Sequence, residues 1–474
     1  MTRFKKIGLF SLAALLIITI AGFIFLSLAD NNKATDRNQH NQTVLSDILH
    51  NRPKQFFITA WNSPTLYSGN FPNFKMLPQA TINDNFKVAK SAGLDALIET
   101  FPLSFADNVK LGRLPTSDQS FMQALNASNL SAIVTEPTFE ARFHFSPLAK
   151  NDYSFSNNSA ILGVRGYDEP GVPAFEKIAA SKKAFLERFP DKFYYVNILG
   201  STAPSSALYL GGDNTGNATY SGAPISYEEY VSQYMKTVHP QLLSFDHYPF
   251  MATGTDPTYL SNLSYLASVA QKANIPLWSF IQDEGFPYHR APNLTDIKWE
   301  VATNLAFGVS GIEYFAYDAE NQKGFTPAMV ANGKKTPIFY DIQKVNQELR
   351  SFQSAFFAYK WQSAVAIQPD TDKNATTTEM IRDLQQSSTS ISGISSYQFK
   401  NASLIGTFSA DSNKKQKAYL VSNIEETDNQ VTLHFEKSTR CTLYLGGKKQ
   451  EITLKNQTLT FKLPAGEAAF VTPE

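Results

Sequence analysis

Four carboxylates in this 474-residue sequence lie within or just after short apolar runs, where the side chains at the end of a strand become available for chemistry. Asp168 and Glu169 come directly after ILGVRGY, Asp246 lies in LLSFDHY, and Glu284 comes two residues after PLWSFIQ. A converging pair of carboxyl groups can cleave a glycosidic bond, because one protonates the leaving oxygen while the other serves as nucleophile or base. The pattern therefore favours glycosidic-bond cleavage.

Further polar and aromatic residues end the same set of runs, and we expect them to bind the substrate. They are Trp61, Asn62, Glu136, Asp246, His247, Tyr248, Gln282 and Tyr317. Neither a group of Lys and Arg nor a glycine-rich cradle accompanies them, as phosphoryl transfer would require. The sequence has only 7 His and one Cys, Cys441, so we expect no metal and no cofactor. Its 42 basic and 42 acidic residues balance, so the expected partner is a carbohydrate and not a nucleic acid.

The runs belong to a repeating pattern between residues 53 and 360, in which short strand-like segments alternate with longer amphipathic ones. The predicted strands are Gln55–Trp61, Asp95–Phe101, Ser131–Glu136, Ile161–Tyr167, Phe193–Leu199, Leu242–Tyr248, Pro276–Gln282 and Gly311–Tyr317. The helices expected among them include Thr81–Ala92, Ser226–Val238, Thr258–Ala273 and Thr295–Phe307.

Eight strands joined by helical crossovers predict an α/β fold of the (β/α)8 TIM-barrel type, with parallel strands. The competing fold, a doubly wound open sheet, is disfavoured because no Gly-x-Gly-x-x-Gly turn follows the first strand. The active site of a TIM barrel lies at the C-terminal ends of its strands. We therefore expect the candidate residues to gather at that end of the barrel.

The segments on either side of the barrel have different textures. Residues 361–474 contain short strand-like runs separated by Gly, Asn, Asp and Lys, which predicts a small all-β sandwich that covers the barrel flank. Residues 1–29 carry Arg3, Lys5 and Lys6 before an uncharged apolar run, Ile7–Ala29, long enough to cross a bilayer. Residues 30–52 are polar and are expected to be a linker.

Basic residues stay on the cytoplasmic side of a membrane, so we expect everything after residue 30 to lie outside the cell. We expect the apolar run to be an uncleaved single-pass anchor. The alternative is a signal segment cleaved after Ala29, because Ser27-Leu28-Ala29 offers the small residues of a cleavage site.

Several of these motifs together resemble glycoside hydrolase clan A, a group of retaining (β/α)8 enzymes. GVRGYDEPG resembles the strand-four segment that carries the acid/base, and PLWSFIQDEG resembles the strand-seven segment that carries the nucleophile. LLSFDHYPF resembles strand six and WEVATNLAFGVSGIEYFAYD resembles the last helix and strand, while the C-terminal region resembles the β domain that often follows such barrels. The resemblance implies Glu169 as general acid/base and Glu284 as nucleophile.

Two departures from the clan pattern leave other functions open. Asp168 stands where the clan usually has Asn, and Gln282 stands where the nucleophilic Glu is expected, with Glu284 two residues later. Adjacent Asp168-Glu169 is also similar to hexosaminidases in which the substrate's N-acetyl group is the nucleophile, oriented by the Asp. The alternative from another class is a surface protein that binds carbohydrate without cleaving it. Converging carboxyl groups would distinguish the two functions, because only an enzyme needs them.

Overall fold

The computed structural model describes residues 43, 45–48, 50–51, 53–68, 75–102, 118–136, 139, 158–201, 209, 225–318, 324–370, 374–384, 390–411 and 413–474. The predicted membrane segment, Ile7–Ala29, lies outside these residues and stays a prediction. Within the part that is described, no helix is both long and apolar enough to span a bilayer.

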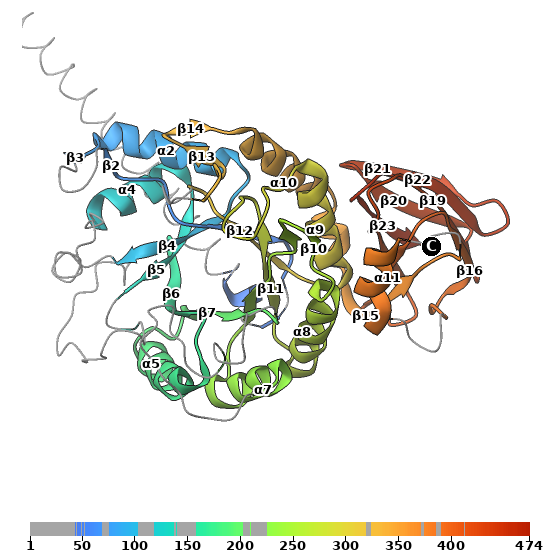
Figure 1. Ribbon diagram of the computed structural model, residues 1–474, viewed down its shortest axis with the longest axis horizontal. Helices are drawn as coiled ribbons and strands as arrows, with labels where there is room; N and C mark the ends of the chain where they lie inside the picture. The colour runs from blue at the N-terminus through green and yellow to red at the C-terminus, as the bar shows by residue number, and fades with distance from the viewer. Residues whose placement is uncertain are drawn as a thin grey trace, which may run out of the picture.

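Eight parallel strands close into a barrel, which confirms the predicted fold (Figure 1). They are β1 (Phe57–Trp61), β4 (Ala96–Pro102), β5 (Ser131–Thr135), β6 (Ile161–Asp168), β7 (Phe193–Leu199), β8 (Leu243–Asp246), β11 (Leu277–Gln282) and β12 (Gly311–Phe315). Closure is made by β1, which pairs with β4 through Thr59 and Ala96 and with β12 through Thr59 and Glu313.

Helices surround the barrel and connect its strands (Figure 1). The described ones are α2 (Gln79–Ser91), α4 (Asp118–Ser128), α5 (Phe175–Arg188), α7 (Tyr227–Val238), α8 (Tyr259–Ala273), α9 (Leu294–Ala306) and α10 (Pro337–Phe356), with the 3-10 turn η1 (Val172–Ala174) before α5. Their starts follow local chemistry: Ser226 caps α7 by accepting from the backbone N–H of Glu229, and Asn293 with Asp296 forms a capping box at α9.

Short two-stranded ribbons extend the strand-to-helix loops. They are β2 (Tyr67–Ser68) with β3 (Lys75–Met76), β9 (Phe250–Met251) with β10 (Gly254–Thr255), and β13 (Val330–Ala331) with β14 (Lys334–Lys335). Because these loops follow the C-terminal ends of β1, β8 and β12, they border the end of the barrel at which TIM-barrel sites lie.

Alternate strand positions fill the barrel interior with aromatic rings. Trp278 stacks on Phe57, with ring centroids 5.0 Å apart, and meets the edge of Phe193 at 6.0 Å. Gly311 lies against the same indole, where a Cβ atom would come within 2.2 Å of Trp278. The lower part of the barrel is therefore packed solid, and chemistry is confined to its upper end.

The bottom of the barrel is closed by a helical stretch at residues 45–48, which corrects part of the predicted linker. Leu45 and Ile48 are 6% and 3% exposed and belong to the same buried cluster as Phe57 and Trp278. The two aliphatic residues are three positions apart, so they share one face of the helical turn and cover the aromatic floor.

The C-terminal region consists of β sheets, as predicted. A six-stranded sheet holds β15 (Tyr359–Ile367), β17 (Ser403–Ala410), β18 (Lys417–Asn423), β23 (Ala468–Pro473), β20 (Arg440–Leu445) and β21 (Lys448–Thr453), and a three-stranded sheet holds β16 (Ile394–Phe399), β19 (Asn429–Phe435) and β22 (Thr458–Leu463). A buried apolar cluster fills the space between the sheets. The region also contains α11 (Ala375–Ile381) and the turn η2 (Arg382–Leu384), which the all-β prediction missed.

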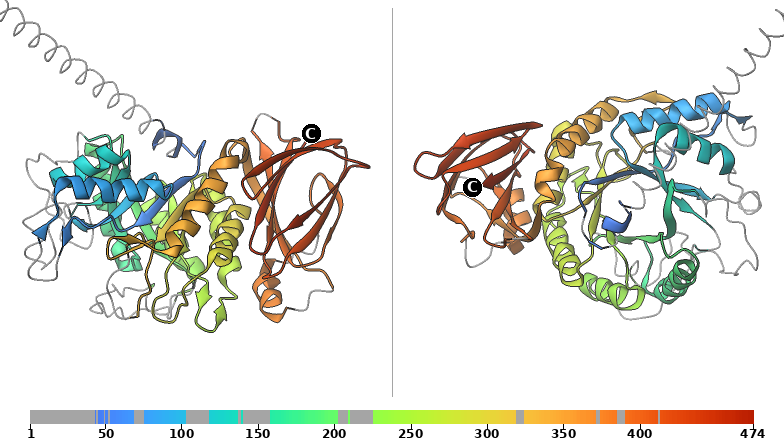
Figure 2. Two further views of the ribbon diagram at one scale, coloured as in Figure 1. Left: turned by 90° about the horizontal axis from the view of Figure 1, so that it is seen from above. Right: turned by 180° about the vertical axis from the view of Figure 1, so that it is seen from behind.

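These sheets pack against the flank of the barrel at α9 and α10, away from the strand ends (Figure 2). Trp299 on α9 donates its indole N–H to the carbonyl of Ile424 at 3.2 Å. Lys298, also on α9, forms ion pairs with Glu348 and Glu467. This position agrees with the predicted role of the C-terminal region as a cover for the barrel flank.

Candidate active site

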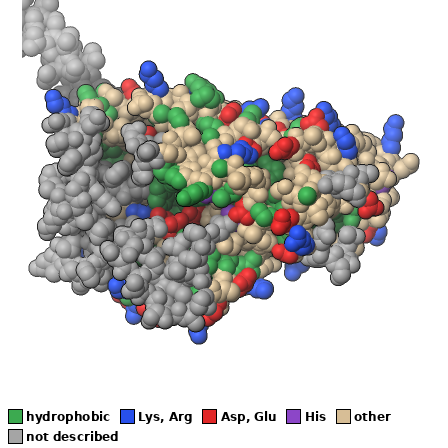
Figure 3. All heavy atoms as spheres, viewed as in Figure 1, with side chains coloured by type: hydrophobic (Ala, Val, Ile, Leu, Met, Phe, Trp, Pro, Cys, Tyr) green, Lys and Arg blue, Asp and Glu red, His purple; other side chains and the backbone are tan. Residues whose placement is uncertain are grey.

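Three carboxyl groups meet where β6 and β8 end. Asp168 closes β6, Glu169 follows it, and Asp246 closes β8. Glu169 adopts a left-handed backbone conformation, with φ of 51°, and its N–H donates to the carbonyl of Asn197 at 2.9 Å. All three side chains keep part of their surface exposed. Figure 3, which looks onto this end of the barrel, shows acidic side chains beside hydrophobic ones near the middle of the face.

The carboxyl groups of Glu169 and Asp246 lie next to each other at this end of the barrel. A contact between two carboxyl groups needs a proton, because two carboxylates offer only acceptors. Burial raises the pKa of Asp246 well above its usual value, and the charge and hydrogen bond of Glu169 and the charge of Asp168 raise it further, while a hydrogen bond from Asn197 opposes the shift. The pair therefore holds a proton at a pH at which an isolated aspartate would have lost it.

An arginine, Arg165, balances this negative charge from the interior face of β6. The guanidinium of Arg165 lies 3.9 Å from Asp168, donates to the hydroxyl of Thr135 at 3.0 Å, and sits over the ring of Trp61 at 5.1 Å. Trp61 and Arg165 are 8% and 3% exposed. Trp61 therefore touches the site through the arginine, and its surface is largely covered in this structure.

A β-bulge explains how two residues three apart reach the same place. The register between β6 and β7 shifts between Arg165 and Tyr167, so that Asp168 faces the barrel interior together with Arg165. Gly166 occupies the bulge because a Cβ there would come within 2.0 Å of the Tyr194 ring. Simple strand alternation would place Arg165 and Asp168 on opposite faces.

The layer directly below the three carboxyl groups is polar and fully buried. The hydroxyl of Tyr195 donates to Glu313 at 2.8 Å, and Ser244 contacts the other oxygen of Glu313 at 2.7 Å. The Ser244 hydroxyl also lies 3.0 Å from the side-chain amide oxygen of Asn197, whose side-chain N–H2 donates to Asp246 at 3.0 Å and to Asp168 at 3.4 Å. Hydrogen bonds thus run from the barrel interior to the three carboxyl groups.

An aromatic wall borders the carboxyl groups on the β8, β11 and β12 side. Tyr248 is half-buried and meets Phe286 edge-on at 5.2 Å and Phe315 at 5.3 Å. Burial and the charges of Asp246, Glu169 and Asp168 raise the pKa of Tyr248, so its hydroxyl remains a donor. Aromatic faces next to hydrogen-bonding groups suit an amphipathic ligand such as a sugar ring.

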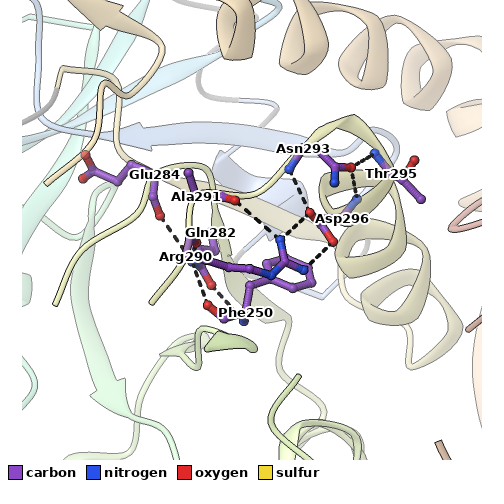
Figure 4. A network of polar contacts seen from close by, with 8 residues as sticks. All are labelled: Phe250, Gln282, Glu284, Arg290, Ala291, Asn293, Thr295 and Asp296. Atoms are coloured by element: carbon purple, nitrogen blue, oxygen red, sulfur yellow. Dashed lines mark hydrogen bonds and ion pairs between the residues drawn. The ribbon is translucent and has the colours of Figure 1, made fainter. Parts of the chain in front are cut away.

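The end of β11 is built differently, although the sequence places a nucleophile there. Gln282 is completely buried, and its amide is used by main-chain groups: the oxygen accepts from Phe250, and the nitrogen donates to the carbonyls of Arg290, Glu284 and Phe250 at 2.8, 3.2 and 3.5 Å (Figure 4). The guanidinium of Arg290 forms a two-pronged ion pair with Asp296 at 2.7 and 2.8 Å. Gln282 therefore ties two loops together, which argues against the predicted contact with substrate.

The two acids that follow Gln282 are also enclosed. Asp283 is fully buried, and neither oxygen of its carboxyl has a hydrogen-bond partner among the residues that the structure describes. Burial raises the pKa of Asp283, and the charges of Glu284 and Glu300 add to the shift. Glu284 is 1% exposed, and Figure 4 shows its side chain directed away from the contacts of Gln282 and Arg290. Its predicted role as nucleophile would require substrate to reach a carboxyl that is now covered.

Two predicted substrate-binding residues face the surrounding helices instead of the barrel mouth. His247 is 1% exposed, lies 3.3 Å from Asp256, and stands edge-on to Tyr259 of α8. Tyr317 is 1% exposed and its hydroxyl reaches the carbonyl of Asn85 on α2. His247 comes one residue after Asp246, the last residue of β8, and Tyr317 comes two residues after Phe315, the last residue of β12. Both strands end earlier than predicted, so strand alternation does not continue and these side chains turn outward.

Two further predicted residues end strands but are largely covered. Asn62 is 6% exposed, has a φ of 67°, and bridges β1 to the carbonyl of Asp318 at 3.4 Å. Glu136 is 7% exposed and follows β5. The structure therefore brings together Asp168, Glu169, Asp246 and Tyr248, with Trp61 linked to them through Arg165.

Sequence reasoning missed the residues that support these groups: Arg165, Tyr195, Asn197 and Ser244 lie within strands, where it considered mainly strand ends. Tyr195 and Asn197 alternate with Phe193, so strand periodicity could have indicated their inward direction. Arg165 could not have been placed with Asp168 without knowledge of the bulge. Among the described residues, no group of three or more His, Cys, Asp or Glu side chains is arranged to hold a metal ion.

Comparison with known proteins gives structural neighbours but no sequence relatives. No protein-family model matches the chain, and no curated protein matches its sequence. A catalytic mutant of a family 42 β-galactosidase from G. stearothermophilus superposes with a TM-score of 0.54 at 8% identity, covering 89% of this chain and 99% of that one. The chain therefore shares the overall fold of this solved structure.

Two other solved structures are similar at lower scores. A family 5 glycoside hydrolase from Bacteroides vulgatus ATCC 8482 has a TM-score of 0.47 at 11% identity, with 88% of this chain and 89% of that one covered. A family 30 xylanase from Clostridium acetobutylicum has a TM-score of 0.40 at 10% identity, with 89% and 100% covered. At such identities the likeness concerns the fold alone, so activity has to be argued from the site.

Proposed function

We propose that this protein hydrolyses glycosidic bonds in an extracellular oligosaccharide or polysaccharide, with Glu169 as the general acid/base. The observation that carries the proposal is that the carboxyl groups of Glu169 and Asp246 are adjacent at the C-terminal end of the barrel, where burial raises the pKa of Asp246. A proton held between two carboxyl groups, beside an aromatic wall, is what the first step of glycoside cleavage uses. The barrel fold supports the same proposal as an analogy.

In this mechanism the pair supplies the proton and does not supply the nucleophile. Retaining enzymes separate their two carboxyl groups by about 5–5.5 Å and inverting enzymes by ~6.5–9.5 Å, and both separations exceed a hydrogen-bonded contact. Asp246 therefore keeps a proton on the pair until the glycosidic oxygen accepts it from Glu169. The attack on the anomeric carbon must come from another group.

Two sources of that attack remain, and both are proposals. Glu284 lies two residues after the expected strand-seven position, in step with strand alternation, and would need its cover to open. The substrate's own N-acetyl group is the second source, with Asp168 orienting it. The locked amide of Gln282 favours this second candidate, because the position where clan A carries its nucleophile holds a residue engaged by three main-chain carbonyls.

A panel of chromogenic glycosides, with and without 2-acetamido groups, tests the proposal on the isolated extracellular part of the chain. If Glu284 is the nucleophile, Glu284→Gln abolishes turnover on every substrate that the wild type cleaves. If the acetamide attacks, only N-acetylated sugars are cleaved, Glu284→Gln changes little, and Asp168→Asn is the damaging variant. Absence of cleavage by the wild type, together with measurable sugar binding, would replace the enzyme by a carbohydrate-binding surface protein.

The place of action is proposed from the N-terminal sequence. We propose that residues 7–29 hold the protein at the cell membrane, with the barrel outside, or that cleavage after Ala29 releases it. Protease added to intact cells should digest the barrel of an anchored protein. Full protection of the barrel in intact cells, with digestion after lysis, would place it inside.

A further inference from the structure

Glu313 lies in the middle of the barrel, one layer below Glu169 and Asp246, and is completely buried. It contacts no position that a substrate could reach directly, yet its two oxygens hold the hydroxyls of Tyr195 and Ser244. Three strands thus converge on one carboxyl group: β12 carries Glu313, β7 carries Tyr195, and β8 carries Ser244.

The number of protons shared by the side chains around Glu313 decides which of their contacts can be hydrogen bonds. Tyr195, Ser244, Glu313 and the side-chain amide oxygen of Asn197 make four contacts of 2.7 to 3.0 Å. The two hydroxyls supply only two protons. When Glu313 is ionised, both hydroxyls donate to it, and the Asn197 oxygen then faces the serine oxygen without a proton between them.

A neutral Glu313 gives a better set of hydrogen bonds. Its own proton goes to the Ser244 oxygen, Ser244 then donates to Asn197, and Tyr195 donates to the second oxygen of Glu313. Three of the four contacts become hydrogen bonds instead of two. The Asn197 amide is then fixed with its N–H2 group directed at Asp246 and Asp168.

We infer that neutral Glu313 is a positioning residue, which acts through Ser244 to fix the Asn197 amide and thereby the carboxyl of Asp246 beside Glu169. The inference deepens the proposed function and rests on it for its effect on turnover. Glu313 needs no contact with the substrate for this role, because Ser244 and Asn197 link it to Asp246 through hydrogen bonds.

The surroundings of Glu313 agree with a neutral side chain. Burial raises its pKa to about 8, although the hydrogen bonds from Ser244 and Tyr195 lower it, and the charge of Asp168 raises it further. Of the groups that face it, Tyr195 on β7 and Asp168 on β6 can titrate, Ser244 on β8 and Thr59 on β1 are neutral, and β11 contributes apolar rings. Arg165 is the neighbouring cation and pairs with Asp168.

Three variants separate positioning from simple packing. Ser244→Ala removes the link between Glu313 and Asn197, and should lower kcat about tenfold to a hundredfold with little change in KM, because a misplaced catalytic group slows the reacting step. Glu313→Gln keeps a neutral side chain that donates to Ser244, and should retain most of the activity below pH 8. Thr59→Val is the matched control in the same buried layer, since the Thr59 hydroxyl has no hydrogen-bond partner within the described part of the chain, and should behave as the wild type.

A readout without substrate completes the test. The side-chain amide resonance of Asn197, assigned with Asn197→Asp, should shift with a midpoint near pH 8 in the wild type and in Thr59→Val. It should not shift in Ser244→Ala or Glu313→Gln. An Asn197 amide that ignores pH, or that titrates equally in all variants, would overturn the positioning role. If the amide titrates as expected while the wild type cleaves no glycoside, the proposed function fails and the positioning network stands.

Discussion

The ends of β6 and β8 and the end of β11 carry similar residues but have different structures. On the β6 and β8 side, Asp168, Glu169 and Asp246 are partly exposed and share hydrogen bonds and charge with one another. On the β11 side, Gln282 and Glu284 are buried at 0% and 1% exposure, and Gln282 is fastened to two loops. Polar residues at strand ends are thus left partly exposed at one place and enclosed by loop contacts at the other.

The two regions differ in whether their polar groups can still interact with a ligand. An amide whose oxygen and nitrogen are both bonded to the main chain can hold loops but cannot turn to a ligand. A carboxyl pair that shares a proton and keeps exposed surface can exchange that proton with an incoming oxygen. Substitutions on one side at a time separate these two roles.

Replacement of Glu169 should have the largest effect on activity. Glu169→Gln keeps the shape but removes the transferable proton, so kcat should fall ~10²–10⁴-fold. Glycosides with good leaving groups should be least affected, because they need little protonation. Steady-state rates on aryl glycosides of increasing leaving-group pKa measure this. Equal activity of variant and wild type on all of them would remove Glu169 from the mechanism.

Replacement of Gln282 should affect stability instead. Gln282→Glu brings carboxylate oxygens towards three main-chain carbonyls in a buried place, and an uncompensated buried charge costs about 3–5 kcal/mol. Urea unfolding measures the loss, which should be smaller at low pH, where the new acid is neutral. Gln398→Glu on the exposed face of β16 is the control, expected within about 0.5 kcal/mol of the wild type. Increased turnover in Gln282→Glu with unchanged stability would show that β11 is a catalytic position after all.

Replacement of Asp246 should move the pH dependence. The raised pKa of Asp246 lets the pair keep its proton above the usual value of 3.8, so Asp246→Asn should shift the alkaline limb of kcat/KM to lower pH. The folded protein binds this proton more tightly than the unfolded chain, so its stability falls as pH rises from 3.8 towards the folded pKa. Asp246→Asn removes that loss and should flatten the stability profile there. Unchanged profiles of activity and stability would contradict the shared proton.

Two tyrosines offer the smallest and most closely matched comparison. Tyr248→Phe removes a hydroxyl beside the three carboxyl groups and should lower kcat/KM about tenfold, the effect of one lost hydrogen bond of roughly 1.4 kcal/mol. Tyr317→Phe removes a hydroxyl that faces α2 and should leave activity within about twofold. Equal effects of the two changes on kcat/KM would mean that the hydroxyl of Tyr248 is not used.

Much of the fold could be predicted because hydrophobic period and capping residues act locally. Ser226–Val238 and Thr258–Ala273 differ from α7 and α8 by one residue at their starts. The helical stretch at residues 45–48 was missed because its two aliphatic residues gain their meaning only from the aromatic floor of the barrel. Tertiary contacts of this kind cannot be predicted from the sequence of a short polar segment.

The site was predictable where a residue ends a strand and unpredictable where geometry departs from alternation. Asp168, Glu169, Asp246 and Tyr248 were expected at the mouth and lie together there. The bulge at Gly166 brings Arg165 to Asp168, and the loop contacts of Gln282 remove it from the mouth. Neither effect follows from the local sequence, because each depends on which backbone groups of a neighbouring strand or loop are close.

A direct titration of Asp246 tests whether Glu169 and Asp246 share a proton. Protein labelled with ¹³C at aspartate carboxyl carbons, with Asp246→Asn used for assignment, gives the pKa of Asp246 by NMR. We expect a value well above 3.8 in the wild type and a lower one in Glu169→Gln, which removes a charge and a hydrogen-bond partner. An Asp246 carboxyl that titrates near 3.8 in both proteins would contradict the account.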